Sequence, residues 1–136
     1  MSQRKPAELI GVDDYTALLD ELRQLAASLI PAPECVIGMK RSGLFPAVYL
    51  SHQLELPMLV ESEIRSMPCG KFSTALLADT TAWKGKSLRR ATLKLERAGV
   101  EVVHIVAMFS RREPPPDVPG LCFLRRADAI PRFWYE

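Results

Sequence analysis

The stretch LLADTTAWKGKSL, residues 76–88, changes character half-way along its length. It opens as an apolar run, which is typical of a strand buried on both faces. It continues through an acid, small residues and a tryptophan to Lys84-Gly85-Lys86-Ser87, after which a helical pattern begins. Basic side chains and the unbonded N–H groups at the start of a helix attract anions. The stretch therefore predicts a buried strand that leads into a phosphate-binding loop.

The rest of the chain alternates between helical and strand-like patterns. These patterns predict helices over 13–29, 44–54 and 87–98, and strands over 35–39, 56–60, 74–78, 102–109 and 121–124. Between them lie a loose lead-in over 1–11, a polar loop over 61–71 and a stiff proline-rich linker over 113–120. The alternation predicts an α/β fold, a three-layer domain in which helices flank a mostly parallel central sheet. At 136 residues, the chain fits a single domain spanning 1–136.

Composition limits the classes of partner. Apolar residues make up 48% of the chain and charged residues 25%, which is ordinary for a globular domain. The net charge of +2 and the scattered basic residues argue against a nucleic-acid partner. The chain shows neither an N-terminal signal region nor an apolar stretch near the ~18 residues of a membrane span, so we expect no membrane partner and a cytoplasmic location.

The three cysteines, Cys35, Cys69 and Cys122, are widely spaced and form no CxxC or Cys/His cluster. This spacing predicts neither a zinc site nor a disulfide framework, and we expect no metal held by a protein cluster. Cys35 and Cys122 lie in apolar runs, so we expect them to be small core residues.

A second loop of similar chemistry, Lys40-Arg41-Ser42-Gly43, follows the strand predicted over 35–39. The carboxyl ends of parallel strands meet at one edge of a sheet, where ligands of such folds bind. Two anion-binding loops at that edge suit a ligand with two phosphate-bearing ends. A Walker A loop is disfavoured, because that motif needs a glycine five residues before Gly85, where Thr80 stands.

Residues 75–88 resemble the diphosphoribosyl-binding motif of type I phosphoribosyltransferases. That motif has four apolar residues, two acids, two small or apolar residues, a further acid and then Thr-Gly-any-Thr, and it aligns here without a gap. Residues 36–47 resemble the family's pyrophosphate loop, and residues 100–112 resemble the strand that precedes its base-binding region. The closing RFWYE, 132–136, resembles the aromatic C-terminus of small purine-type members. The resemblance covers roughly residues 34 to 112.

The resemblance implies roles for individual residues. The ribose hydroxyls would be bound by Asp79 and by Thr80, which replaces the second acid. The loop for the 5-phosphate would comprise Thr81, Ala82, Lys84, Gly85, Lys86 and Ser87. The pyrophosphate would be held by Lys40, Arg41, Ser42 and Gly43. Contacts with the base would come from Arg111, Trp134 and Trp83, which replaces the third acid.

The implied activity is phosphoribosyl transfer between phosphoribosyl pyrophosphate and a nucleobase, with a purine favoured. The resemblance also implies Mg²⁺ bound mainly through the diphosphate, and a homo-oligomer. The family's flexible lid would fall in residues 61–73, which are few, so a neighbouring subunit could complete the site. Two alternatives stay open: a nucleotide- or phosphoribosyl-pyrophosphate-binding sensor without turnover, and a flavodoxin-like binding domain that matches by chance.

Overall fold

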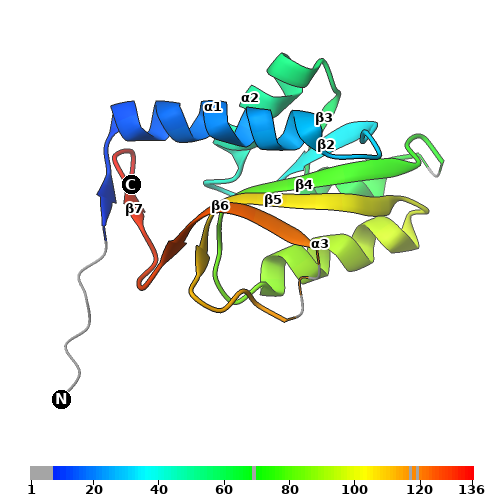
Figure 1. The fold of residues 1–136 in the computed structure, drawn as a ribbon. Coiled ribbons are helices and arrows are strands. Elements are labelled where there is room, and N and C mark those ends of the chain that lie inside the picture. Colours follow the sequence, from blue (N-terminus) through cyan, green and yellow to red (C-terminus); the bar gives the residue numbers. More distant parts are fainter. Residues whose placement is uncertain (1–7, 69, 117, 119) are drawn as a thin grey trace.

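The computed structural model describes residues 8–68, 70–116, 118 and 120–136. Its central sheet has five parallel strands in the order β3-β2-β4-β5-β6. The strands are β2 (Cys35–Gly38), β3 (Met58–Val60), β4 (Thr74–Ala82), β5 (Glu101–Arg111) and β6 (Leu121–Ala127). The helices α1 (Val12–Ser28) and α2 (Leu44–Leu54) cover one face, and α3 (Lys86–Arg97) covers the other (Figure 1). The predicted three-layer α/β fold is confirmed.

The strands are buried on both faces, as their unbroken apolar runs predict. In β4, Leu76 packs in the core beneath α1 and α2, whereas its neighbour Leu77 packs in the core beneath α3. Leu88 and Leu95 of α3 complete the second core and are almost fully buried. Burying each of these side chains contributes roughly 1.5–3 kcal/mol. This double burial holds the carboxyl ends of β2 and β4 rigidly side by side.

Strand β4 is four residues longer than predicted. Residues 79–82 stay paired with β5, with Asp79 opposite Ala107 and Ala82 opposite Ser110. Small and polar residues suggested a loop here, but threonine suits a pleated, half-buried strand. The loop before α3 is therefore only residues 83–85, instead of the stretch from Asp79 to Lys86.

Two very short strands were not predicted. The strand β1 (Leu9–Ile10) pairs in parallel with β7 (Arg132–Phe133) in a separate two-stranded sheet. Figure 1 shows this small sheet beside the carboxyl ends of the central strands. The predicted lead-in over 1–11 is thus wrong for Leu9 and Ile10, and its residues 1–7 lie outside the described part of the chain.

The predicted polar loop over 61–71 is also wrong in its first half. Residues Glu61–Ser66 form a 3₁₀ helix, η1, in which Glu61 and Ile64 are buried. The Glu61 carboxylate accepts a hydrogen bond from Arg90 Nε at 2.8 Å and another from Lys94 Nζ at 3.3 Å. These contacts attach the segment to α3. Of the thirteen residues 61–73, the six of η1 are therefore held against α3.

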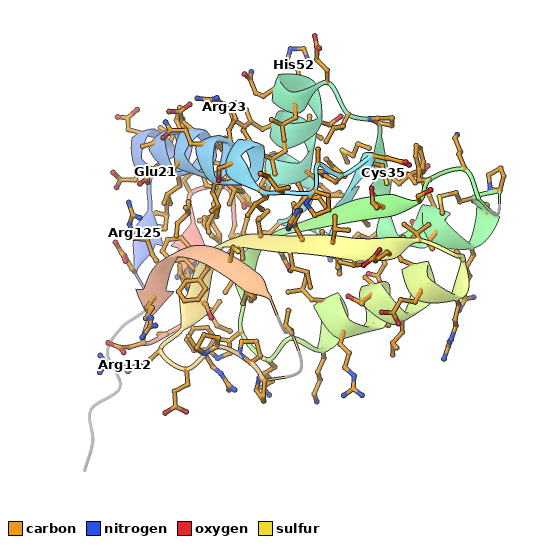
Figure 2. The ribbon with its side chains drawn as sticks, turned by 45° about the vertical axis from the view of Figure 1, so that its right-hand side comes forward. Glu21, Arg23, Cys35, His52, Arg112 and Arg125 are labelled. Carbon is orange, nitrogen blue, oxygen red and sulfur yellow. The ribbon has the colours of Figure 1, made fainter. Side chains whose placement is uncertain are left out.

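The described cysteines and histidines lie outside the loops that were predicted to bind anions. Cys35 is buried in β2, Cys122 is half-buried in β6, and Cys69 lies outside the described residues. His52 is exposed on α2, and Figure 2 shows it well away from the sheet. His104 donates a hydrogen bond to the Pro31 carbonyl at 2.6 Å. No helix in the described part of the chain is both long and apolar enough to cross a membrane.

Candidate functional site

A cavity of about 330 Å³ lies where β4 ends and α3 begins. Its lining brings together all six residues predicted for the 5-phosphate: Thr81, Ala82, Lys84, Gly85, Lys86 and Ser87. Asp79, Trp83, Leu88 and Ile130 complete the lining. The Thr81 hydroxyl is buried and has no hydrogen-bond partner among the described residues. A buried hydroxyl without a partner costs free energy.

The start of α3 supplies backbone donors to this cavity. Helix hydrogen bonding begins at Arg89, whose N–H bonds to the Gly85 carbonyl at 2.9 Å. The preceding residues, Lys86, Ser87 and Leu88, have no carbonyl of their own helix within reach. No side chain among the described residues caps this helix end. With Lys84 and Lys86 exposed beside these amides, the end of the cavity is electropositive and suits a phosphate.

The backbone conformation and the packing at position 85 both favour glycine. Its φ is +80°, a conformation that residues with a Cβ rarely adopt. A Cβ built there would lie 2.5 Å from Val118 Cγ2 and 3.0 Å from Pro115 Cβ. The proline-rich segment that we predicted to be a linker therefore packs its buried Pro115 and Val118 onto the start of α3. Gly85 makes room for this packing.

Asp79 lies between the two predicted anion loops. Its Oδ1 accepts a hydrogen bond from the Thr80 N–H at 2.8 Å. A Cβ on Gly43 would approach Asp79 Oδ1 to 3.0 Å and the Ala78 carbonyl to 2.9 Å, so only glycine permits this approach. Burial raises the pKa of the Asp79 carboxyl to about 7, although the backbone N–H groups of Thr80 and Thr81 lower it. At neutral pH this carboxyl both donates and accepts protons readily.

The loop Lys40–Gly43 lies beside Asp79 but outside the cavity lining. A cis peptide bond joins Lys40 to Arg41, and both side chains are exposed at the sheet edge. Ser42 Oγ lies 3.0 Å from the Tyr135 hydroxyl, within hydrogen-bond distance. The loop is thus tied on one side to Asp79 through Gly43, and on the other to the segment that contains β7.

Besides the Lys40–Gly43 loop, three predicted site residues do not reach the cavity. Thr80 is only 2% exposed and is absent from the lining, because successive side chains of β4 point to opposite faces. Arg111 ends β5, where its Nε donates to the Glu113 carbonyl at 2.7 Å. Trp134 follows β7 and is half exposed, with its ring 5.4 Å from that of Tyr135. Of the predicted base contacts, only Trp83 lines the cavity.

Sequence reasoning missed Ile130, and it missed the contact between Tyr135 and Ser42. Ile130 lines the cavity although it is 52% exposed and 43 positions from Ser87. Tyr135 packs its ring 4.6 Å from Phe45 and stacks on Phe133 at 5.6 Å, which places its hydroxyl at Ser42. No local pattern indicates either position. Only the aromatic composition of residues 132–136 hinted that this segment packs against the site.

Solved structures of known proteins share this architecture. The purine phosphoribosyltransferase of Pyrococcus horikoshii Ot3 matches 96% of this chain and 93% of its own, with 20% identity and a TM-score of 0.77. The xanthine-guanine-hypoxanthine phosphoribosyltransferase of Helicobacter pylori matches 96% and 94%, with 16% identity and a TM-score of 0.78. This chain has the type I phosphoribosyltransferase fold. A hypothetical protein from Neisseria gonorrhoeae with bound ppGpp is also similar, at 12% identity over 97% of this chain and 91% of its own, with a TM-score of 0.73.

The sequence comparisons add no relative to these. No family model matches the chain, and a search of curated proteins gives no match. The structural similarity, at 20% identity or less for these three proteins, establishes the fold. Any role of the site residues in this chain therefore has to be argued from their own geometry.

Proposed function

We propose that this protein transfers a phosphoribosyl group between phosphoribosyl pyrophosphate and a nucleobase, with a purine as the base. The observation that carries the proposal is the position of Asp79. Its carboxylate lies against Gly43 of the Lys40–Gly43 loop and lines the cavity formed by Thr81–Ser87. A ligand with a phosphate at one end and a diphosphate at the other would present its ribose hydroxyls to this carboxylate.

Different residues would bind the two phosphate-bearing ends of phosphoribosyl pyrophosphate. The start of α3 would hold the 5-phosphate through its amides, Lys84 and Lys86, while Lys40 and Arg41 would face the diphosphate. In the transfer, the bond from the anomeric carbon to the diphosphate oxygen breaks, a bond to a base nitrogen forms, and the proton of that nitrogen passes to water or to the departing diphosphate. Positive charge develops on the sugar, so anchoring both ends and stabilising the departing diphosphate supply most of the rate increase.

The residues around the cavity suit a Mg²⁺ ion that is bound mainly by the substrate. The described residues contain no group of three or more His, Cys, Asp or Glu side chains that could hold a metal ion. Asp79 is the only carboxylate among the described residues that line the cavity. This suits a Mg²⁺ ion that enters with the substrate and is held mainly by diphosphate and ribose oxygens, since Mg²⁺ commonly binds through substrate phosphates. The chain's own contribution is to orient those oxygens.

A nucleotide sensor without turnover is the second candidate. Two features favour it: Trp83 lies in the cavity where a third acid would stand, and Thr80 points away from it. The Neisseria protein, described with bound ppGpp, indicates that a guanine nucleotide rich in phosphates can occupy a protein of this fold. A sensor would keep both anion loops and need no base-side proton acceptor.

One experiment separates the two candidates. Purified protein is incubated with phosphoribosyl pyrophosphate, Mg²⁺ and, in turn, hypoxanthine, guanine, adenine and orotate, while pyrophosphate release is measured. Calorimetry of phosphoribosyl pyrophosphate, nucleoside monophosphates and ppGpp accompanies it. Release with a purine supports the transferase. Tight binding without release for any base replaces it with the sensor, and absence of all binding refutes both.

A further inference from the structure

A second basic surface lies outside the candidate active site. A groove of about 510 Å³ runs along the outer face of α3, next to η1. Seven side chains line it, of which Leu93 is the only apolar one. The other six are cationic: Arg65, Lys86, Arg89, Arg90, Lys94 and Arg97. Those on α3 recur at spacings of three and four residues, so they share one face of the helix. We call this surface the α3 groove.

Three carboxylates of the described residues lie near this region, and none of them lines the α3 groove. Glu63 of η1 folds back so that its Oε1 accepts the Val60 N–H at 2.9 Å. Glu96 of α3 lines a different cavity, between that helix and β5. Glu61 is buried, with its side chain only 9% exposed. Positive charge is therefore concentrated on the groove instead of alternating with acids, as it does on ordinary solvated helix faces.

Glu61 also holds two of the cations in place. It receives Arg90 through Nε and Nη2, at 2.8 and 3.3 Å, and Lys94 through Nζ at 3.3 Å. Arg90 keeps a 59% exposed side chain after this pairing. A guanidinium fixed by a buried carboxylate loses little freedom on binding a second anion, which is how preorganised anion sites gain affinity.

We propose that the α3 groove binds a soluble oligophosphate, separately from the candidate active site. The groove volume lies within the ~300–1,000 Å³ range of small-molecule sites. Its lining is nearly all cationic, which suits a compact ligand with several negative charges. Arginine forks match phosphate oxygens in pairs. Lys86 lines both this groove and the active-site cavity, so occupation of one site is felt electrostatically at the other.

Two macromolecular occupants fit the groove less well. Proteins that bind single-stranded nucleic acid stack bases on aromatic side chains, and no aromatic residue is present in this described lining. An amphipathic peptide helix needs a row of apolar contacts, whereas Leu93 is the one apolar side chain here. The charge pattern is therefore suited to phosphate groups alone.

The test uses inorganic tripolyphosphate as the probe. Calorimetry is performed on the full chain, on the groove variant Arg65→Gln/Arg97→Gln, and on the control variant Arg112→Gln/Arg132→Gln. The four arginines are exposed, and each pair of changes removes two positive charges. We expect the groove variant to lose at least tenfold in affinity for tripolyphosphate, and the control to stay within twofold. Binding of a nucleoside monophosphate, measured alongside, should be unchanged in both.

Each other result overturns the proposal. Equal losses in both variants would show only a general charge effect. Unchanged affinity in the groove variant, with competition from the nucleoside monophosphate, would place tripolyphosphate in the active-site cavity. Tighter binding of a short RNA duplex than of tripolyphosphate, lost in the same variant, would make the groove a nucleic-acid surface. Because the monophosphate reports on the cavity independently, failure of the proposed function remains distinguishable.

Discussion

Replacing Asp79 with asparagine should make the protein more stable at neutral and alkaline pH while it abolishes phosphoribosyl transfer. Burial raises the pKa of this carboxyl from 3.8 to about 7. The folded protein therefore holds the proton more tightly than the unfolded chain does. Its favourable contribution is complete below the unfolded pKa of 3.8 and is lost as the pH rises through 7. Asparagine is uncharged at every pH and escapes that loss.

The magnitude follows from the shift. Three pKa units, at ~1.36 kcal/mol each, correspond to about 4 kcal/mol of unfolding free energy at pH 8. At pH 5 the expected gain in unfolding free energy of the Asp79→Asn variant falls to about 1.5 kcal/mol. Near pH 3.5 the two proteins should be equally stable. The amide oxygen of asparagine can still accept the Thr80 N–H, so the variant keeps that hydrogen bond. The gain should therefore be visible as a pH-dependent difference between the two proteins.

Urea unfolding of both proteins at pH 8 and pH 5 measures this difference. The matched control is Asp13→Asn, which makes the same chemical change at an exposed position in the first turn of α1. That control should lose a few tenths of a kcal/mol, because an acid near a helix N-terminus is stabilising. An Asp79→Asn variant that is less stable at pH 8, or equally affected at both pH values, would refute the reasoning.

Three further outcomes are expected. Arg41→Ala should weaken phosphoribosyl pyrophosphate at least tenfold in calorimetry but leave a nucleoside monophosphate within twofold; equal losses would detach Arg41 from the diphosphate. Gly85→Ala should cost about 2–4 kcal/mol in thermal unfolding, since it adds a Cβ at positive φ against Val118; an unaffected midpoint would contradict this. Glu61→Gln should cost ~1 kcal/mol at pH 7, because Arg90 lowers the pKa of Glu61, and this cost should shrink as the pH falls below 4.5 through that lowered pKa; a pH-independent cost would exclude the ion pair as its source.

Local patterns predicted the elements that bury apolar side chains continuously. The helix over 44–54 matches α2 residue for residue, and the apolar run from Cys35 leads into the loop that carries Lys40. Such runs are self-sufficient signals, because burial on a parallel sheet requires them whatever the partner strand is. Because each anion loop follows a parallel strand, the order of strands and loops predicted that both loops lie at the same edge of the sheet.

Long-range pairing explains what the sequence did not reveal. Residues 79–82 are polar or small, and only the register with β5 keeps them in the strand. The strands β1 and β7 have two residues each and lie more than 100 positions apart, so neither has a pattern of its own. Glu61 looked like a loop acid because its partners, Arg90 and Lys94, lie on another element. The local pattern of one sequence does not show which distant residues pair with each other.

Two buried carboxylates near α3 differ in how their charge is compensated, and this difference separates structure from function. Glu61 has two cations within 3.3 Å, and Arg90, first among them, lowers its pKa. Among the described residues, Asp79 has only the backbone N–H groups of Thr80 and Thr81 as partners, so burial dominates and raises its pKa. A group that serves only the fold is expected to be compensated within the fold, as Glu61 is. The free energy left uncompensated at Asp79 is what a ligand's hydroxyl donors would recover, and this is the physical reason to place the reaction there.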